Sequence, residues 1–303
     1  MMSRISTIIA TLTGVYALSL TAVIPLVTAE PPPIALRVAG LWRSGDGSRQ
    51  ILVSGLPTGA FIAKRNQLAE QGLAISAIAV YPANDEDNYV AIFEPTSNSE
   101  TVTNLLAGTW EQFAAKDMEM FNKGFRLVDI ALSIDPHDVR KVRYTGVWKD
   151  GLGTGAQWTD PAMSWDDFIA KAKDRFDKGL RLVAMDAIAV GGGQHKALFA
   201  GTWRDGQGTG ALYFIPPSDG PEYNERLMKH FNNGLRSVAF STYTMNGQTP
   251  MYVGAMRGGL GKPGEWNSPA LKWDEFVAEH KSKAAQGYRL VDISVYMQFT
   301  KID

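Results

Sequence analysis

One segment of the chain alternates apolar and polar residues, and a later segment repeats apolar residues at every third or fourth position. From 142 to 148 the alternating residues are aromatic or β-branched, which is typical of a β-strand. After a glycine-rich loop, the apolar residues Phe168, Ile169, Ala172 and Phe176 recur at helical spacing. The pattern predicts a strand, a glycine loop and a helix with one buried face.

Both ends of this predicted helix carry residues that helix ends favour. Ser164 stands at the N-cap position and Asp167 follows three residues later, much like a capping box. At the other end, the cation of Lys178 suits the helix dipole, and Gly179 can adopt the left-handed conformation of a C-terminal cap. A second apolar run at 180–185 predicts another strand. The unit is therefore strand, glycine loop, helix, strand.

The same unit occurs five times, with a period of about 53 residues. Each copy ends its helix at a glycine and has an aromatic residue eleven positions earlier. The glycines are Gly72, Gly124, Gly179, Gly234 and Gly287, and the aromatic residues are Phe61, Phe113, Phe168, Tyr223 and Phe276. A single unit cannot bury its own apolar face. We therefore predict an α+β fold of five repeats, at about 37–88, 89–141, 142–196, 197–250 and 251–303, stacked or closed into a propeller-like ring.

Three copies depart from this pattern. The first has Ala74 where the others have arginine, the second has a serine- and threonine-rich loop in place of the glycine loop, and the fourth has 216–221 in place of the tryptophan that starts the helix. Such copies are where a ligand site could differ from the scaffold. The alternative is sequence drift in solvent-facing loops.

The first 29 residues differ from the repeats. A basic start at Arg4 precedes an apolar stretch at 8–27 and small residues up to Ala29, which is the pattern of a cleaved signal peptide. The alternative is an uncleaved membrane anchor. A proline-rich spacer follows at 30–36. We therefore expect a secreted or periplasmic protein that meets a membrane only through an uncleaved signal segment.

The composition is that of a folded chain. Hydrophobic residues make up 45%, charged residues 20%, and the net charge is −1, so no overall positive field attracts nucleic acid. The chain has no cysteine, so its stability must come from packing and not from disulfides.

The motifs of the third copy resemble a known family. They are Tyr-x-Gly-Val-Trp at 144–148, Trp-x-x-Phe at 165–168 and Gly-Leu-Arg-Leu-Val at 179–183. They resemble the bacterial tandem repeat domain and the N-terminal repeat region of secreted polyglycine hydrolases, and the likeness covers 37–303. In those hydrolases a serine β-lactamase-like domain with a Ser-x-x-Lys motif performs the cleavage. This sequence has neither that motif nor Lys-Thr-Gly, so the resemblance implies the accessory repeats without the catalytic part.

Five side chains are candidate ligand contacts. Tryptophans beside the loops could stack on a sugar or a peptide, or belong to the core. Aspartates in the glycine loops could bind a cation, and the loops resemble phosphate cradles, but each loop has only one carboxylate and fits a simple strand-end turn. The candidates are Trp42, Trp148, Trp203, Asp150 and Asp205.

An arginine follows the helix-ending glycine by two positions in four copies. These are Arg126, Arg181, Arg236 and Arg289. They could hold carboxylates in bidentate fashion on a ring surface. The interpretation we favour is structural: they pair with backbone carbonyls, or with Asp129 and Asp292, and lock one copy to the next.

No catalytic motif stands out. The four histidines are too scattered for a metal motif, and no nucleophile elbow is present. We expect no catalytic residue, no metal and no cofactor. The predicted function is a secreted, non-catalytic repeat module that binds an extended peptide, a glycan or a protein partner. The alternatives are a hydrolase whose site is assembled from different repeats and an architectural envelope protein.

Overall fold

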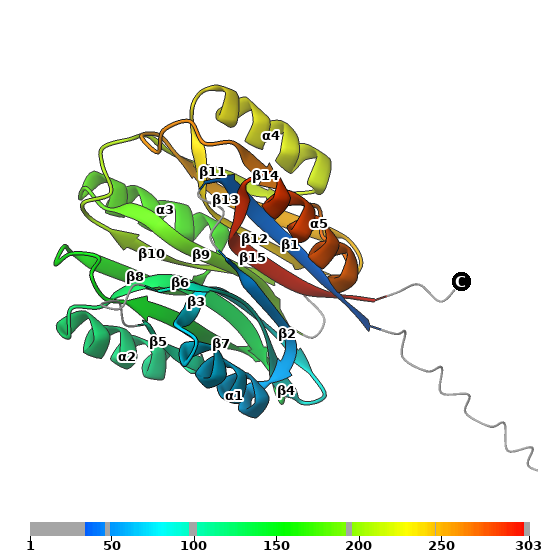
Figure 1. Ribbon diagram of the computed structural model, residues 1–303. Coiled ribbons are helices and arrows are strands. Elements are labelled where there is room, and N and C mark those ends of the chain that lie inside the picture. Colours follow the sequence, from blue (N-terminus) through cyan, green and yellow to red (C-terminus); the bar gives the residue numbers. More distant parts are fainter. Residues whose placement is uncertain (1–33, 46–48, 97–101, 192–195, 246, 300–303) are drawn as a thin grey trace, which may run out of the picture. The chain divides into compact units, whose positions relative to one another are not determined.

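The computed structural model describes residues 34–45, 49–96, 102–191, 196–245 and 247–299. The predicted signal peptide and the prolines of the spacer lie outside these residues. The described part is α+β and contains five helices and five three-stranded antiparallel sheets (Figure 1). Its first strand begins at Ile34, so residues 34–36, which we predicted to be spacer, belong to the fold.

Each sheet has an outer, a central and an inner strand. The outer strands are β2 (Ile51–Pro57), β5 (Val102–Gly108), β8 (Gln157–Met163), β11 (Leu212–Ser218) and β14 (Glu265–Asn267). The central strands are β4 (Glu86–Pro95), β7 (Asp138–Lys149), β10 (Lys196–Arg204), β13 (Pro250–Arg257) and β1 (Ile34–Ser44). The inner strands are β3 (Leu73–Ala83), β6 (Arg126–Asp135), β9 (Arg181–Val190), β12 (Arg236–Thr244) and β15 (Tyr288–Phe299). The helices are α1 (Thr58–Ala69), α2 (Trp110–Asn122), α3 (Trp165–Asp177), α4 (Gly220–Asn232) and α5 (Trp273–Ala285).

The outer strand is a feature that the sequence analysis missed. In the third copy it is β8, which contains Pro161, and its pairing with β10 is interrupted by a register shift between Phe199 and Gly201. Proline is tolerated at a sheet edge, and a bulge breaks the two-residue alternation, so the strand pattern is hidden. The repeating unit is therefore strand, loop, outer strand, helix, inner strand.

Each sheet combines strands from two copies. The outer and inner strands flank one helix, and the central strand between them is the first strand of the next copy. Antiparallel strand pairing therefore joins one copy to the next. In the fifth sheet the central strand is β1, which pairs with β14 and β15, so that Ile34 lies opposite Phe299. The first and last described strands of the chain are thus neighbours in one sheet (Figure 1).

The helix ends follow the predicted pattern. The Ser164 side chain accepts a hydrogen bond from the backbone N–H of Asp167, and Thr109 and Gln112 form a full capping box. The five helix-ending glycines all have positive φ, from 72° at Gly72 to 87° at Gly124 and Gly234. Only glycine adopts this conformation without strain. None of the described helices is long and apolar enough to cross a membrane.

The core lies between neighbouring sheets. In the second sheet, the ring of Phe113 on α2 packs on Trp148 of β7, with centroids 5.4 Å apart. The same cluster includes Ala184 and Ala200 on the facing side of the third sheet. The other four boundaries are built alike, including the boundary from the fifth sheet to the first, where Phe276 and Trp42 share a cluster with strands of the first sheet.

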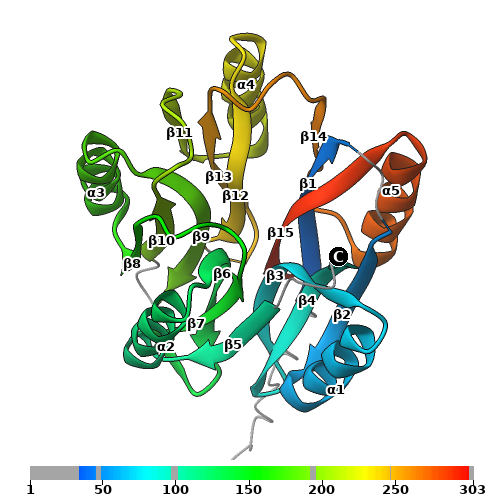
Figure 2. The ribbon, with the colours of Figure 1, turned by 60° about the vertical axis from the view of Figure 1, so that its left-hand side comes forward.

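The inner strands contact one another in succession. β3 contacts β6, β6 contacts β9, β9 contacts β12, β12 contacts β15, and β15 contacts β3. Figure 2 shows these strands toward the middle of the body and the helices on its outside. The repeats therefore present their helices and outer strands to solvent.

Candidate functional site

The three predicted tryptophans lie in the core and not at a binding surface. Trp42, Trp148 and Trp203 have no exposed surface, because each lies on a central strand beneath its helix. The Trp148 indole N–H donates to Asp117 at 2.7 Å, and that of Trp42 donates to His280 Nδ1 at 3.4 Å. A ligand cannot reach these rings. The three tryptophans therefore belong to the hydrophobic core, which was the alternative interpretation.

The glycine loops act as strand-end turns. Gly151, Gly153, Gly206 and Gly208 all have positive φ. Asp150 and Asp205 are half-buried. A Cβ on Gly155 of the first loop would lie 1.7 Å from the carboxylate of Asp205 in the second loop, so consecutive loops pack closely. No group of three or more potential metal ligands occurs among the described residues.

The repeated arginines bind backbone carbonyls in three copies. In the second copy, Arg126 donates to the carbonyl of Phe125 at 2.7 Å and lies over the ring of Phe121 at 4.2 Å. Arg181 and Arg236 make the same contacts in their own copies. Arg289 has Ala284 in place of the phenylalanine and makes none of these contacts in the described structure. The carbonyl pairing that we favoured is confirmed for three of the four arginines.

The aspartates that we considered as partners of these arginines bind backbone amides instead. Asp129 accepts from Ile78 N–H at 2.6 Å, and Asp292 accepts from Phe240 N–H at 3.0 Å, each across a repeat boundary. Asp186, in the copy between them, accepts from Leu132 at 2.6 Å. The three residues keep some accessible surface, but the strands around their carboxyls raise their pKa values. Burial raises the pKa of Asp292 to about 8 and that of Asp186 to about 6.

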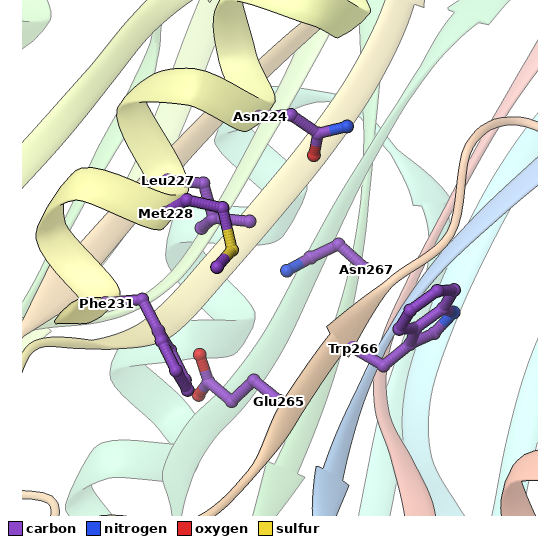
Figure 3. Close-up of a pocket in the computed structure, with 7 residues that line it drawn as sticks. All are labelled: Asn224, Leu227, Met228, Phe231, Glu265, Trp266 and Asn267. Atoms are coloured by element: carbon purple, nitrogen blue, oxygen red, sulfur yellow. The ribbon is translucent and has the colours of Figure 1, made fainter.

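A groove lies between α4 and β14, on the outside of the boundary between the fourth and fifth sheets (Figure 3). Its volume is about 330 Å³. The wall on α4 consists of Asn224, Leu227, Met228 and Phe231, and the wall on β14 consists of Glu265, Trp266 and Asn267. Met228 is 51% exposed and Trp266 42%. These are large apolar side chains that remain open to solvent.

The groove lacks a polar bridge that another boundary has. At the corresponding boundary between α2 and β8, Asp117 accepts hydrogen bonds from Gln157 and Thr159, both at 2.9 Å, and ties helix to strand. Leu227 takes the place of Asp117, since both stand seven residues before the helix-ending glycine. Leucine cannot accept a hydrogen bond. Asn267, in the place of Thr159, is left with a buried Oδ1 that has no hydrogen-bond partner among the described residues.

Other boundaries are filled or bridged differently. Between α1 and β5 the guanidinium of Arg65 donates to Asn104 at 2.8 Å beside a cavity of about 300 Å³. Between α3 and β11 the ring of Phe214 packs against Phe168, with centroids 5.7 Å apart. Between α5 and β2 a cavity of about 440 Å³ contains His280, whose Nδ1 already accepts from Trp42. The α4–β14 groove differs from these in combining apolar walls with an unpartnered amide oxygen.

The β14 wall is held rigidly. Glu265 accepts from Arg43 and from the backbone N–H of Ser237, so its carboxylate is already neutralised and only 2% exposed. The Trp266 indole N–H donates to Glu279 at 2.7 Å, and Lys283 Nζ lies 3.5 Å from the ring centroid. In Figure 3 the side chains of Glu265 and Asn267 point toward α4, and the ring of Trp266 points away from it.

The outer edge of β14 carries free main-chain groups. β14 pairs only with β1 among the described strands. The bonds from Ser44 N–H to Gly264 and from Ser268 N–H to Gly40 direct every second residue toward β1. By the alternation of an antiparallel ladder, the N–H and C=O groups of Glu265 and Asn267 point to the open side. The strand can therefore accept another extended chain.

Aromatic residues with accessible surface recur on the outer strands of three copies, and the sequence analysis missed them. Trp158 lies under Arg175 at 4.3 Å, Tyr213 stacks on His230 at 3.5 Å, and Trp266 lies under Lys283. Each partner stands four residues before the helix-ending glycine. The recurring pair of an aromatic residue on a strand and an arginine, histidine or lysine at that helix position was the available signal.

Three segments of the chain match a known family of structural repeats. Residues 109–150, 162–205 and 271–301 match the family described as polyglycine hydrolase-like, structural repeat. Three copies of this chain are therefore similar to polyglycine hydrolase-like repeats. The match confirms the family to which the motifs pointed. No curated protein matched the chain. The three matched segments cover α2, α3 and α5, and the helix that forms one wall of the groove, α4, lies outside them.

Proposed function

We propose that the protein is a non-catalytic repeat module that binds an extended peptide along β14, in the groove next to α4. The observation that carries this proposal is the free edge of β14 beside apolar side chains. A peptide strand added to this edge would bond to the main-chain groups of Glu265 and Asn267. Its alternate side chains would then point toward Met228 on one face and toward Trp266 on the other.

The chemistry of the groove favours a peptide over a glycan. Leu227, Met228 and Phe231 form an apolar wall that suits aliphatic or aromatic side chains, and methionine adapts to different shapes. Sugars need several polar side chains around a stacking ring, and here the carboxylate of Glu265 is already taken by Arg43. The unpartnered Oδ1 of Asn267 suits an N–H donor.

We also propose that the five sheets act as one closed, propeller-like ring. Support comes from β1, which completes the fifth sheet, and from the contact of β15 with β3. Closure leaves no repeat with an uncovered apolar face. The rigid frame would hold the groove in the open shape required for binding. The export of the chain, inferred from its first 29 residues, stays a prediction.

The test is selection of random dodecapeptides displayed on phage against the purified protein, followed by affinity measurement with one selected peptide. Met228→Glu should weaken binding by about tenfold or more, because it places a charge against the apolar side chains of the peptide. Trp266→Ala should weaken it as well, since the opposite face loses its aromatic contact.

Met118→Glu is the matched control. Met118 stands at the same position of α2, six residues before the helix-ending glycine, and is 62% exposed. This variant should bind the peptide like the wild type. Equal binding by the Met228→Glu variant would show that the groove is not the site. Retention of arrayed glycans that is lost in Met228→Glu, with no peptide selected, would make the ligand a glycan.

A further inference from the structure

Four arginines gather at one end of the third and fourth sheets. Arg181 begins β9 and lies opposite Arg204 at the end of β10, and Arg236 begins β12 and lies opposite Arg257 at the end of β13. β9 and β12 contact each other, so the two cross-strand pairs belong to neighbouring sheets. Like charges directly opposite each other on a sheet are destabilising unless something compensates them.

Three of these guanidinium groups lack partners that their counterparts have. Nε of Arg181 and both Nε and Nη1 of Arg204 and Arg257 are buried without a hydrogen bond in the described structure. Arg181 and Arg257 are only 6% exposed. Buried donors that are charged and unpaired are costly. Such donors in a folded protein call for an acceptor.

The contrast with the other copies shows what is missing. Nε of Arg126 donates to the carbonyl of Gly155 at 3.1 Å, and Nε of Arg236 donates to that of Pro263 at 2.8 Å, whereas Arg181 has no such bond. Arg43, in the place of Arg204 and Arg257, is neutralised by Glu265 on the adjacent outer strand.

The residues opposite Arg204 and Arg257 on the outer strands cannot form an ion pair, as Glu265 does with Arg43. Gln157 lies opposite Arg204, and Leu212 lies opposite Arg257. Gln157 is uncharged and directs its amide to Asp117 and to the backbone of Leu127. Leucine has no acceptor at all. The positive charge of these two sheets therefore has no carboxylate where the fifth sheet has one.

The charges act on one another. Burial lowers the pKa of Arg204, and the charges of Arg126 and Arg257 lower it further, while Asp205 opposes them. Burial likewise lowers the pKa of Arg257, with added effects of Arg181 and Arg43. Among the described residues, Asp205 is the acidic group that raises the pKa of Arg204, and it does not balance these cations.

Glycine-containing loops follow two of the arginines. Arg204 is followed by Asp205 and Gly206, and Arg257 by Gly258 and Gly259. Gly206 and Gly259 have positive φ, which other residues rarely adopt. Arg204 is partly exposed, so solvent reaches the cluster.

We propose that Arg181, Arg204 and Arg257 form a binding site for a tetrahedral oxyanion, phosphate or sulfate. The guanidinium fork is suited to such oxygens, and several arginines together balance more than one negative charge. This site lies apart from the peptide groove, because none of its arginines lines the cavity between α4 and β14. A bound oxyanion would join the ends of the third and fourth sheets.

Thermal unfolding and calorimetric titration test the proposal. Inorganic phosphate or sulfate should raise the Tm of the wild-type protein above its value in chloride at equal ionic strength. The rise should be about 3 °C when the anion is present at ten times its Kd.

The Arg257→Gln variant should lose this rise. Its Tm in chloride should be no lower than that of the wild type, because the substitution removes an uncompensated charge. Arg140→Gln is the control, since the Arg140 side chain is 80% exposed outside the cluster, and it should keep the full rise.

Two results would overturn the site. An equal rise in the wild type and in Arg257→Gln would be a general salt effect. The absence of both a rise and a heat of binding in the wild type, with phosphate, sulfate and phenyl phosphate alike, would show that no oxyanion binds. Parallel titrations with phenyl phosphate and with inorganic phosphate distinguish a phosphate ester from a free ion as the ligand. Binding of both supports a free ion as ligand, and binding of phenyl phosphate alone supports a phosphate ester.

Discussion

Asp292 on β15 accepts a hydrogen bond from the backbone N–H of Phe240 on β12, with 3.0 Å between the two atoms. The residues belong to successive repeats, and Asp129 stands in the same relation to Ile78. Inner strands have no strand partner on their inner edge within their own sheets. Polar side chains of the next repeat therefore satisfy donors that an exposed strand edge would leave free.

This arrangement predicts a fall of stability with rising pH. Burial raises the pKa of Asp292 to about 8 in the folded protein, above the value of about 4 expected in the unfolded chain. Folding then takes up a proton between these values, so the free energy of unfolding decreases as the pH rises from about 4 to about 8. Asp292→Asn cannot ionise. Its Tm relative to the wild type should therefore increase between pH 5 and pH 8.5.

Glu225→Gln on the exposed face of α4 is the control for this series, and its Tm difference from the wild type should stay constant with pH. A relative Tm of Asp292→Asn that falls toward pH 8.5 would contradict the prediction. That outcome would mean that the amides of Phe240 and Ile293 stabilise the ionised carboxylate by more than burial disfavours it.

Two buried tryptophans differ in one hydrogen bond. Trp148 and Trp203 pack on Phe113 and Phe168 with nearly equal geometry, but only Trp148 has an N–H acceptor, Asp117. Trp203 Nε1 has no partner among the described residues. Trp148→Phe should therefore destabilise the protein by about 1–2 kcal/mol more than Trp203→Phe, because it also leaves a buried carboxylate with one donor fewer. Equal losses in urea unfolding would show that the bond to Asp117 contributes nothing.

A glycine two positions before each of these tryptophans makes room for the ring. A Cβ on Gly146 would lie 2.5 Å from the Trp148 ring and 2.7 Å from that of Phe113. In the second copy the corresponding residues are Ala91 and Phe93, a larger residue followed by a smaller ring. Gly146→Ala should thus cost about 1–3 kcal/mol in free energy of unfolding.

The same pair allows a double-mutant cycle. Trp148→Phe should relieve the clash in Gly146→Ala, so the double variant should lose less stability than the sum of the single losses, by about 0.5 kcal/mol or more. Urea unfolding of the four proteins measures this coupling. Additive losses would show that the alanine in the second copy, Ala91, is unrelated to the size of the adjacent ring.

Local patterns in the sequence predicted the helices and their ends, because caps depend on a few neighbouring residues. Ser164 and Gly179 are such positions, and both behave as expected. The outer strands were missed because a proline and a bulge interrupt their alternation, as at Pro161. Strand patterns alone could not separate the buried Trp203 from the exposed Trp158 opposite it. Their burial depends on how far the helix covers each strand, which is a tertiary property.

The groove could have been found from the sequence by comparing the repeats position by position. Asp117 and Leu227 occupy the same helix position, and the change from acceptor to apolar side chain signals a lost bridge. What the sequence does not contain is the strand that faces this position. Because the sequence pattern does not predict β14, Leu227 cannot be distinguished from an ordinary core residue. The arginine cluster was hidden for the same reason, since the pairing of Arg181 with Arg204 joins two copies.

The proposed closure of the ring predicts a strong effect from a single cross-link. Ala35 on β1 lies opposite Gln298 on β15, so cysteines at these two positions should form a disulfide between the ends of the fold. The chain has no other cysteine to interfere. The oxidised variant should be more stable than its reduced form by about 2–4 kcal/mol, because the cross-link closes nearly the whole chain.

Cysteines at Ala189 and Ala197 are the control. These two residues face each other across β9 and β10, so their disulfide closes a short loop and should stabilise the protein less. Urea unfolding with and without reductant measures both differences. If oxidation stabilises the Ala35–Gln298 variant no more than the short-loop variant, or if its disulfide fails to form, β1 is not fixed in the fifth sheet and the repeats form an open stack.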